Sequence, residues 1–134
     1  MCQTFHPLLR PHGRIVNVSS TASSLSNYTP ALQSRFRSPA MTLSDLEAMM
    51  DEYQAAANNG TERRNGWPKQ AYAVSKAAMN ALTATLAREN AGLVINCCCP
   101  GWVATDMGRM VGSTPSKAPS MLGSYFRATR VAVG

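Results

Sequence analysis

Two short apolar segments of this chain have the composition of buried β-strands. Residues 14–19 form a β-branched run after the turn signal Pro11-His12-Gly13, and residues 93–99 form a second run that Pro100-Gly101 stops. Apolar residues are nearly continuous in both runs, which is typical of parallel strands covered on both faces. We therefore predict two buried parallel strands at these positions.

A helix with one apolar face is predicted between the two runs. Thr42 is suited to cap it, and Asp45, three residues on, is suited as a capping-box partner. Apolar side chains then recur at i, i+3, i+4 and i+7, which places them on one helical face. They are Leu46, Met49, Met50 and Tyr53. The Asn-Asn-Gly sequence at 58–60 is predicted to end the helix. We interpret the apolar face as a packing surface rather than a binding groove.

The strongest helical signal is in residues 70–88, which are dense in Ala and lack Gly and Pro. A shorter helix is predicted at 30–36, inside a Ser-, Thr- and Pro-rich stretch at 21–41 that otherwise indicates irregular structure. Residues 5–10 have the pattern of a helix end. The order strand, insertion, helix, strand predicts a parallel βαβ unit with a right-handed crossover.

Length and composition fit one globular domain. The chain has 134 residues, of which 45% are hydrophobic. It contains no run of about eighteen apolar residues, so no membrane-spanning helix is predicted. Thirteen basic and seven acidic residues give a net charge of +6. The basic residues are scattered and form neither a stripe nor a zinc finger. We therefore expect attraction to anionic ligands such as nucleotide phosphates, and no nucleic-acid binding.

The cysteines and the amino end indicate a cytoplasmic protein. Cys97, Cys98 and Cys99 are consecutive, so they lack the two-residue gap of metal sites. Neighbouring residues of a strand point to opposite faces, and we therefore expect reduced, partly buried thiols. Residues 1–7 have neither the charged nor the apolar region of a secretion signal. A cytoplasmic location without membrane association is the expectation.

Candidate catalytic and binding residues lie where the predicted strands end. Tyr72 and Lys76 are four residues apart near the start of the predicted helix at 70–88, so they share a helical face. Ser19-Ser20 end the first strand, and Pro100-Gly101-Trp102 follow the second. Each pattern alone is commonplace: a surface pair, a turn and a strand stop. On a βαβ frame they converge on the carboxyl edge of the sheet, where ligands bind. An ammonium beside a phenol favours the phenolate, and a nearby hydroxyl holds a carbonyl oxygen, which is a constellation for carbonyl reduction.

Four segments carry a resemblance to a known family. They are Gly13-Arg14-Ile15-Val16-Asn17-Val18-Ser19-Ser20, residues 30–38 with the helix after Thr42, Gly66-Trp67-Pro68 leading into Ala71-Tyr72, and residues 96–107, which are the most specific. Over about residues 2–107 the chain resembles the short-chain dehydrogenase/reductase superfamily. Within it, the chain is most similar to the monomeric NADPH-dependent carbonyl reductases. The resemblance implies an α/β fold with a Rossmann-like, doubly wound parallel sheet.

The resemblance implies catalytic roles for three side chains. Tyr72 would donate a proton to the carbonyl oxygen as general acid. Lys76 would favour the phenolate and bind the nicotinamide ribose. Ser20 would orient and polarise the carbonyl, with Ser19 as the alternative serine. NADPH would supply the hydride, with NADH left open as the alternative cofactor.

The resemblance also implies contacts after the second strand. The cofactor contacts, besides Tyr72 and Lys76, would be Pro100, Gly101, Trp102, Val103 and Thr105. Trp102 and Met107 would line, with Ser20, an apolar pocket for an aldehyde or ketone; the alternative for Trp102 is a core aromatic. The insertion would cover the helix face through which many relatives oligomerise, so the resemblance favours a monomer.

The sequence departs from the family pattern in two motifs. It contains no Gly-x-x-x-Gly-x-Gly loop for the pyrophosphate and no Asn-Asn-Ala-Gly motif. We interpret residues 1–107 as the carboxyl-terminal part of a catalytic domain whose amino-terminal half is absent, with an insertion at about 26–68. Residues 108–134 are interpreted as a divergent, poorly ordered tail. An exposed sheet edge, an open sheet face that a helix covers in the family, and compromised reductase activity are then expected. The alternative hypothesis is a catalytically inactive truncated reductase that acts as an interaction element with a full-length relative.

Overall fold

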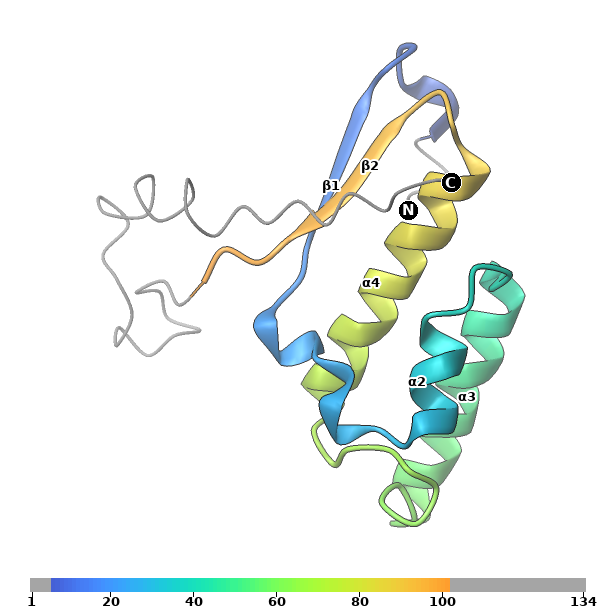
Figure 1. The fold of residues 1–134 in the computed structure, drawn as a ribbon, viewed down its shortest axis with the longest axis vertical. Coiled ribbons are helices and arrows are strands. Elements are labelled where there is room, and N and C mark those ends of the chain that lie inside the picture. The colour runs from blue at the N-terminus through green and yellow to red at the C-terminus, as the bar shows by residue number, and fades with distance from the viewer. Residues whose placement is uncertain (1–5, 102–134) are drawn as a thin grey trace.

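The chain folds into a small sheet, a central helix and an outer pair of helices. The computed structural model describes residues 6–101. Strands β1 and β2 lie beside helix α4, and helices α2 and α3 lie on the far side of α4 (Figure 1). In chain order the elements are a 3-10 helix at His6–Leu8, β1 (Arg14–Val18), 3-10 helices at Thr21–Ser23 and Leu25–Asn27, α2 (Pro30–Phe36), α3 (Leu43–Asn58), α4 (Ala71–Glu89) and β2 (Val94–Cys98).

The two strands are parallel, as predicted, and each is slightly shorter than its apolar run. They pair in register from Arg14 with Val94 to Val18 with Cys98. The backbone N–H of Ser19 also donates to the carbonyl oxygen of Cys98, 2.6 Å away. The carboxyl ends of both strands therefore meet at one edge of the sheet.

Only one face of the two strands is covered among the described residues, which differs from the cover on both faces that the apolar runs indicate and agrees with the expected open face of the sheet. Helices α2, α3 and α4 all lie on one side of the strands (Figure 1). On the other face, Val16, Val18 and Val94 are 48%, 55% and 41% exposed. Successive side chains of a strand point to opposite faces. The continuous apolar run therefore supplies one face that packs on α4 and one that stays open.

Helix α4 separates the sheet from the outer helices. Toward β1, the Nδ2 of Asn17 donates to the Oγ1 of Thr83 at 2.9 Å. Toward α2 and α3, Val74, Ala77 and Ala81 are buried in the hydrophobic cluster. Alanine favours the helix and adds little bulk, so α4 can pack closely on both of its neighbours.

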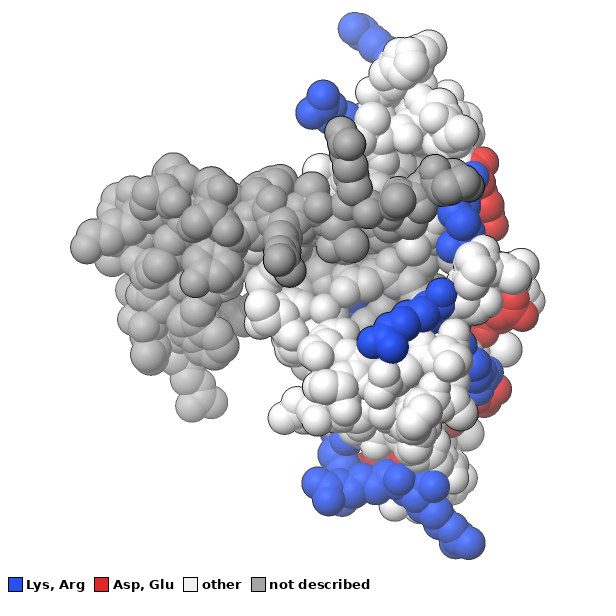
Figure 2. All heavy atoms as spheres, viewed as in Figure 1, with Lys and Arg blue, Asp and Glu red and all other residues white. Residues whose placement is uncertain are grey.

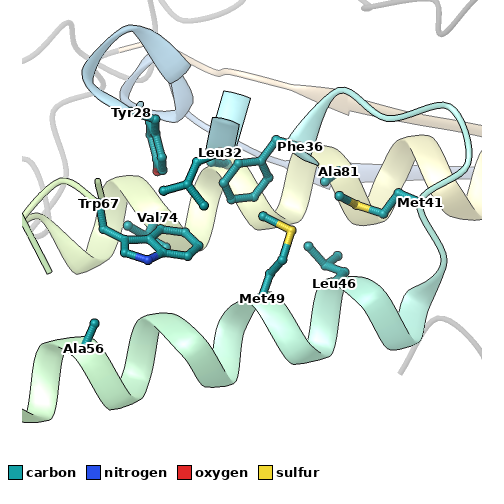
Figure 3. Close-up of a cluster of buried hydrophobic side chains, with 11 residues drawn as sticks. Tyr28, Leu32, Phe36, Met41, Leu46, Met49, Ala56, Trp67, Val74 and Ala81 are labelled. Atoms are coloured by element: carbon teal, nitrogen blue, oxygen red, sulfur yellow. The ribbon is translucent and has the colours of Figure 1, made fainter. Parts of the chain in front are cut away.

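The largest buried cluster lies between α4 and the outer helices rather than under the sheet (Figure 3). Tyr28, Phe36 and Trp67 meet edge to face, with ring centroids 5.4–6.1 Å apart. The predicted apolar face of α3 joins them: Leu46 and Met49 are buried, and Met50 and Tyr53 are partly buried. The insertion thus contributes a core that holds α4 in place, which confirms the packing interpretation of this face.

The predicted capping box starts α3. The N–H of Asp45 donates to the Oγ1 of Thr42 at 3.1 Å, and the N–H of Thr42 donates to the Oδ2 of Asp45 at 2.9 Å. Hydrogen bonds from Thr42 hold the pKa of Asp45 below its ordinary value. The helix ends at Asn58, and Gly60 follows with a φ of 65°. Both ends of α3 agree with the sequence signals.

Gly66 adopts a backbone conformation that favours glycine, with a φ of 86°. A Cβ at this position would lie 2.5 Å from the Oγ1 and 2.6 Å from the Cγ2 of Thr29. The N–H of Thr29 donates to the carbonyl oxygen of Gly66 at 3.2 Å. This close approach joins the start of α2 to the loop before α4 and helps to place the neighbouring Trp67 in the cluster.

Charged side chains on the surface are dispersed. On the face shown in Figure 2, Lys and Arg occur in several separate groups. Arg35 on α2 donates two hydrogen bonds to Glu52 on α3, at 2.6 and 2.8 Å. The Arg35 hydrogen bonds lower the pKa of Glu52. This exposed ion pair links the two outer helices.

Smaller differences from the predicted elements are local. The helix end predicted at 5–10 is a 3-10 turn, and the stretch at 21–41 contains two further 3-10 turns besides the predicted α2. Among the described residues no helix has the length and apolarity to cross a membrane. The tail predicted at 108–134 lies outside the described residues.

Candidate active site

Lys76 connects helix α4 to the end of β1. Its Nζ donates to the carbonyl oxygen of Val18 at 2.8 Å. Val18 is the last residue of β1 and stands two residues before Ser20. The contact places a positive charge at the carboxyl edge of the sheet, where the sequence predicts a ligand site.

Tyr72 lies one helical turn before Lys76. The Nζ of Lys76 is 5.7 Å from the centroid of the Tyr72 ring, within the range of a cation–π contact. The Tyr72 side chain is 53% exposed although it is a large aromatic residue. The shared helical face predicted for the pair is therefore observed, and the phenol is accessible to a bound molecule.

Ser20 follows the strand and starts a 3-10 turn. Its Oγ accepts a hydrogen bond from the N–H of Ala22 at 3.2 Å. Its carbonyl oxygen accepts from the Oγ of Ser23 at 2.6 Å. Within the described residues no acceptor is found for the Ser20 hydroxyl proton. The side chain is thus held through a lone pair while its O–H remains able to donate to a ligand.

Ser19, the alternative serine, is engaged elsewhere. It is only 6% exposed, and its Oγ donates to the Oδ1 of Asn80 at 2.6 Å. The Nδ2 of Asn80 in turn donates to the Oγ of Ser23 at 2.8 Å. A hydroxyl that is buried and already donating is poorly placed to bind a carbonyl oxygen, which favours Ser20 over Ser19.

Sequence reasoning missed Asn80, although a signal was present. Asn80 stands four residues after Lys76 and eight after Tyr72. At about 3.6 residues per turn, these three positions and Thr83 form one stripe along α4. A polar stripe on an otherwise apolar helix indicates the face that meets the strand ends.

Only two of the predicted contact residues after β2 lie within the part of the chain that the structure describes. Pro100 and Gly101 follow β2 at the same sheet edge as Ser19 and Ser20, and Gly101 has a φ of 76° with no heavy atom of residues 6–101 within 4 Å of an added Cβ. The other predicted contacts, Trp102, Val103, Thr105 and Met107, lie outside the described residues.

The cysteines offer no metal site among the described residues. Cys97, Cys98 and Cys99 are free thiols. Burial raises the pKa of the Cys97 thiol, which disfavours the reactive thiolate. In residues 6–101 no cluster of three or more His, Cys, Asp or Glu side chains is arranged to hold a metal ion.

Comparison with known proteins identifies the family. A family model described as enoyl-(acyl carrier protein) reductase matches residues 24–129, which is most of the chain. The chain belongs to the short-chain dehydrogenase/reductase superfamily. The chain is 41% identical to carbonyl reductase (NADPH) 3 of Rattus norvegicus over 121 residues, which are 84% of this chain and 44% of that protein. It is also 41% identical to carbonyl reductase (NADPH) 1 of Bos taurus over 127 residues, 89% of this chain and 45% of the relative.

Two solved structures support the fold of this chain. Salutaridine reductase from Papaver somniferum matches with a TM-score of 0.80 and 28% identity, over 93% of this chain and 45% of that one. Menthone neomenthol reductase from Mentha piperita matches with a TM-score of 0.66 and 36% identity, over 73% of this chain and 36% of that one. The superfamily and the Rossmann-like parallel α/β fold predicted from the sequence are confirmed. The chain spans less than half the length of the curated relatives described above.

Proposed function

We propose that this protein takes part in the NADPH-dependent reduction of aldehydes or ketones. The observation that carries the proposal is the position of Lys76, whose Nζ contacts both the Tyr72 ring and the carbonyl oxygen of Val18. Lys76 thereby links the Tyr72 phenol, the proposed proton donor, to the end of β1, which leads into Ser20. The similarity of the chain to carbonyl reductases (NADPH) supports the same chemistry and cofactor.

The residues at the sheet edge fit a nicotinamide cofactor. The Lys76 ammonium offers donors to ribose hydroxyls, and we assign the backbone at Pro100 and Gly101, which follows β2 at the same sheet edge, to the ring carboxamide on the resemblance. NADPH supplies the hydride when bound. We assign Trp102, Val103 and Thr105 to the same cofactor contact set, and Trp102 and Met107 to the substrate pocket, on the resemblance.

The proposed reduction gives each side chain one task. The Ser20 hydroxyl donates a hydrogen bond to the carbonyl oxygen and polarises it. The Tyr72 hydroxyl would give its proton to the carbonyl oxygen as negative charge develops there, so that an alcohol would be the product. The Lys76 ammonium stabilises the phenolate that remains on Tyr72.

Substitution of Tyr72 tests the proposal. NADPH oxidation is followed by its loss of absorbance with a series of small aldehydes and ketones, using the wild-type chain and Tyr72→Phe. The substitution keeps the ring over which Lys76 lies but removes the proton, so turnover is expected to fall by roughly a hundredfold or more. Tyr28→Phe makes the same chemical change in the buried cluster and serves as the matched control. Equal turnover in wild type and Tyr72→Phe eliminates Tyr72 as the acid.

A wider set of properties goes with this proposal. Residues 1–107 are assigned to the carboxyl-terminal part of a reductase domain, with the insertion near 26–68. A monomeric state is favoured because α2 and α3 cover the outer face of α4. A cytoplasmic location agrees with the three free thiols at Cys97, Cys98 and Cys99.

The open face of the sheet favours a second candidate function. Val16, Val18 and Val94 expose apolar side chains on one surface, and exposed apolar surface promotes association. The chain would then act without turnover, as an interaction element that binds a full-length relative. Light scattering of the chain mixed with such a relative separates the two candidates. Complex formation that Val18→Lys abolishes, with no ketone-dependent NADPH oxidation, supports the second.

A further inference from the structure

We propose that Asn80 is a positioning residue that holds Ser20 in place for carbonyl binding. This inference rests on the proposed function, because it assigns a task in the same site. Asn80 is on helix α4, in the stripe that also carries Tyr72 and Lys76. Its side-chain amide reaches both sides of Ser20 in the chain, through Ser19 before it and Ser23 after it.

The hydrogen bonds around Ser20 form one connected path. Ser19 Oγ donates to Asn80 Oδ1 at 2.6 Å, and Asn80 Nδ2 donates to Ser23 Oγ at 2.8 Å. Ser23 Oγ then donates to the carbonyl oxygen of Ser20 at 2.6 Å. Both ends of the segment that contains Ser20 are thereby fastened to the same side chain of α4.

The donors and acceptors on this path allow one assignment of the protons. Ser23 has a single hydroxyl proton, and the 2.6 Å contact gives it to the Ser20 carbonyl oxygen. Ser23 must therefore accept from Asn80, which requires the amide nitrogen on that side. The amide oxygen is then left to accept from Ser19. A side chain with both a donor and an acceptor is needed, and asparagine supplies them without a net charge.

The 3-10 turn at Thr21–Ser23 packs on α4, and its own hydrogen bonds are formed between neighbouring residues. Within it the N–H of Ser23 donates to the Ser20 carbonyl oxygen at 3.0 Å, and the N–H of Ala22 donates to the Ser20 Oγ at 3.2 Å. A 3-10 turn of three residues has weak hydrogen-bond geometry of its own. The Asn80 contacts therefore decide how rigidly the Ser20 hydroxyl is held relative to Tyr72 on the same helix.

A second contact between β1 and α4 provides a matched control. Asn17 Nδ2 donates to Thr83 Oγ1 at 2.9 Å, one turn farther along the stripe. Thr83→Val removes this contact at nearly constant volume and leaves the Ser20 turn untouched. A general loosening of α4 on the strand would follow from either substitution, but a loosened Ser20 turn would follow only from a change at Asn80.

Amide hydrogen exchange of the full chain, measured by NMR, tests the positioning. In Asn80→Ala, exchange at the N–H groups of Ala22 and Ser23 is expected to accelerate roughly tenfold, the change in local opening expected when one hydrogen bond is lost. Thr83→Val should leave these two amides unchanged. Asn80→Asp has nearly the same shape, and its carboxylate draws the Ser23 proton away from Ser20, so it should resemble Asn80→Ala even if that variant folds poorly. Unchanged exchange at Ala22 and Ser23 in both Asn80 variants overturns the proposal.

Kinetics separate a failure of this inference from a failure of the proposed function. Absence of NADPH-dependent turnover in the wild type overturns the proposed function, whereas the exchange result still decides whether Asn80 holds the turn. Where turnover is measured, Asn80→Ala should lower kcat roughly tenfold, and Ser20→Ala combined with Asn80→Ala should be no slower than Ser20→Ala alone. A double variant that multiplies the two losses shows that Asn80 does not act through Ser20.

Discussion

The ammonium of Lys76 and the carbonyl oxygen of Val18 are joined by a hydrogen bond of 2.8 Å between residues that are 58 positions apart in the chain. The bond fastens the first turns of α4 to the end of β1. It uses one of the three protons of the ammonium, and a second is directed at the Sδ of Met79, a weak acceptor 4.0 Å away. One side chain therefore serves the fold and the proposed site together.

Replacement of Lys76 should affect both roles. Lys76→Met keeps most of the aliphatic length but removes the charge and the hydrogen bond. We expect a loss of about 1 kcal/mol in the free energy of unfolding and weaker NADPH binding, measured by urea denaturation and by fluorescence titration. Lys69→Met, at a position just before α4, is the control. Equal NADPH affinity in Lys76→Met and wild type would contradict the assigned cofactor contact.

The Tyr28 hydroxyl should be dispensable for stability at neutral pH. It is buried and has no hydrogen-bond partner among the described residues. Burial, with a smaller contribution from Tyr53, raises the pKa of Tyr28 to about 12. Tyr28→Phe is therefore expected to leave the free energy of unfolding at pH 7 unchanged or higher, because an unpaired polar group leaves the core. A clear loss of stability would show that the hydroxyl is paired.

The raised pKa of Tyr28 also predicts the direction in which the free energy of unfolding changes at alkaline pH. The folded value of Tyr28 lies above the ordinary value of 10.0, so the folded state retains a proton that the unfolded state has lost. The stabilising contribution is complete below pH 10.0 and is lost as the pH rises toward about 12. Urea denaturation in this window should show a steeper loss for wild type than for Tyr28→Phe.

Gly66 should tolerate no side chain. Gly66→Ala forces a Cβ into the left-handed region and against Thr29, whose Oγ1 would lie 2.5 Å from the added Cβ. A destabilisation of about 2 kcal/mol or more is expected, measured by thermal or urea unfolding. Gly60→Ala has a similar φ, 65°, but no heavy atom within 4 Å, so it isolates the backbone effect. Equal losses in the two variants would show that contact with Thr29 adds nothing.

The ion pair between Arg35 and Glu52 should contribute weakly and only above acidic pH. Arg35 lowers the pKa of Glu52 below its ordinary value of 4.5, so the contribution is present above that value and disappears as the pH falls through the lowered one. Both side chains are about half exposed, and Glu52→Gln should therefore cost less than about 1 kcal/mol at pH 7. Glu47→Gln on the same helix is the control. A difference between Glu52→Gln and wild type that persists in strong acid would exclude the ion pair as its cause.

Local sequence signals predicted the elements because their causes are local. The Thr42–Asp45 capping box, the i, i+3, i+4, i+7 face of α3 and the Ala-rich α4 depend on neighbouring residues alone. The pairing of Tyr72 with Lys76 on one face follows from helical periodicity in the same way. The superfamily was accessible from its motifs for a similar reason, since each motif is a short continuous segment.

Long-range contacts could not be predicted with the same certainty. The apolar runs by themselves indicated cover on both faces of the strands, because a run of apolar residues does not show how many neighbours it has; the open face was expected only from the resemblance to the family. The hydrogen bonds of Asn80 with Ser19 and Ser23 were missed, because 61 and 57 positions of the chain separate the partners. The edge-to-face packing of Tyr28, Phe36 and Trp67 likewise depends on contacts between separate segments of the chain.

The sequence by itself determined the strands, the helices, the superfamily and the set of candidate catalytic and binding residues, because these follow from short-range spacing and residue type. The tertiary structure alone decided which serine hydroxyl is left to donate, where the Lys76 charge lies, and that the main core forms around α4 rather than beneath the sheet. The physical reason is that hydrogen bonds and burial depend on distances in space, and only the folded chain brings Val18, Lys76 and Asn80 together.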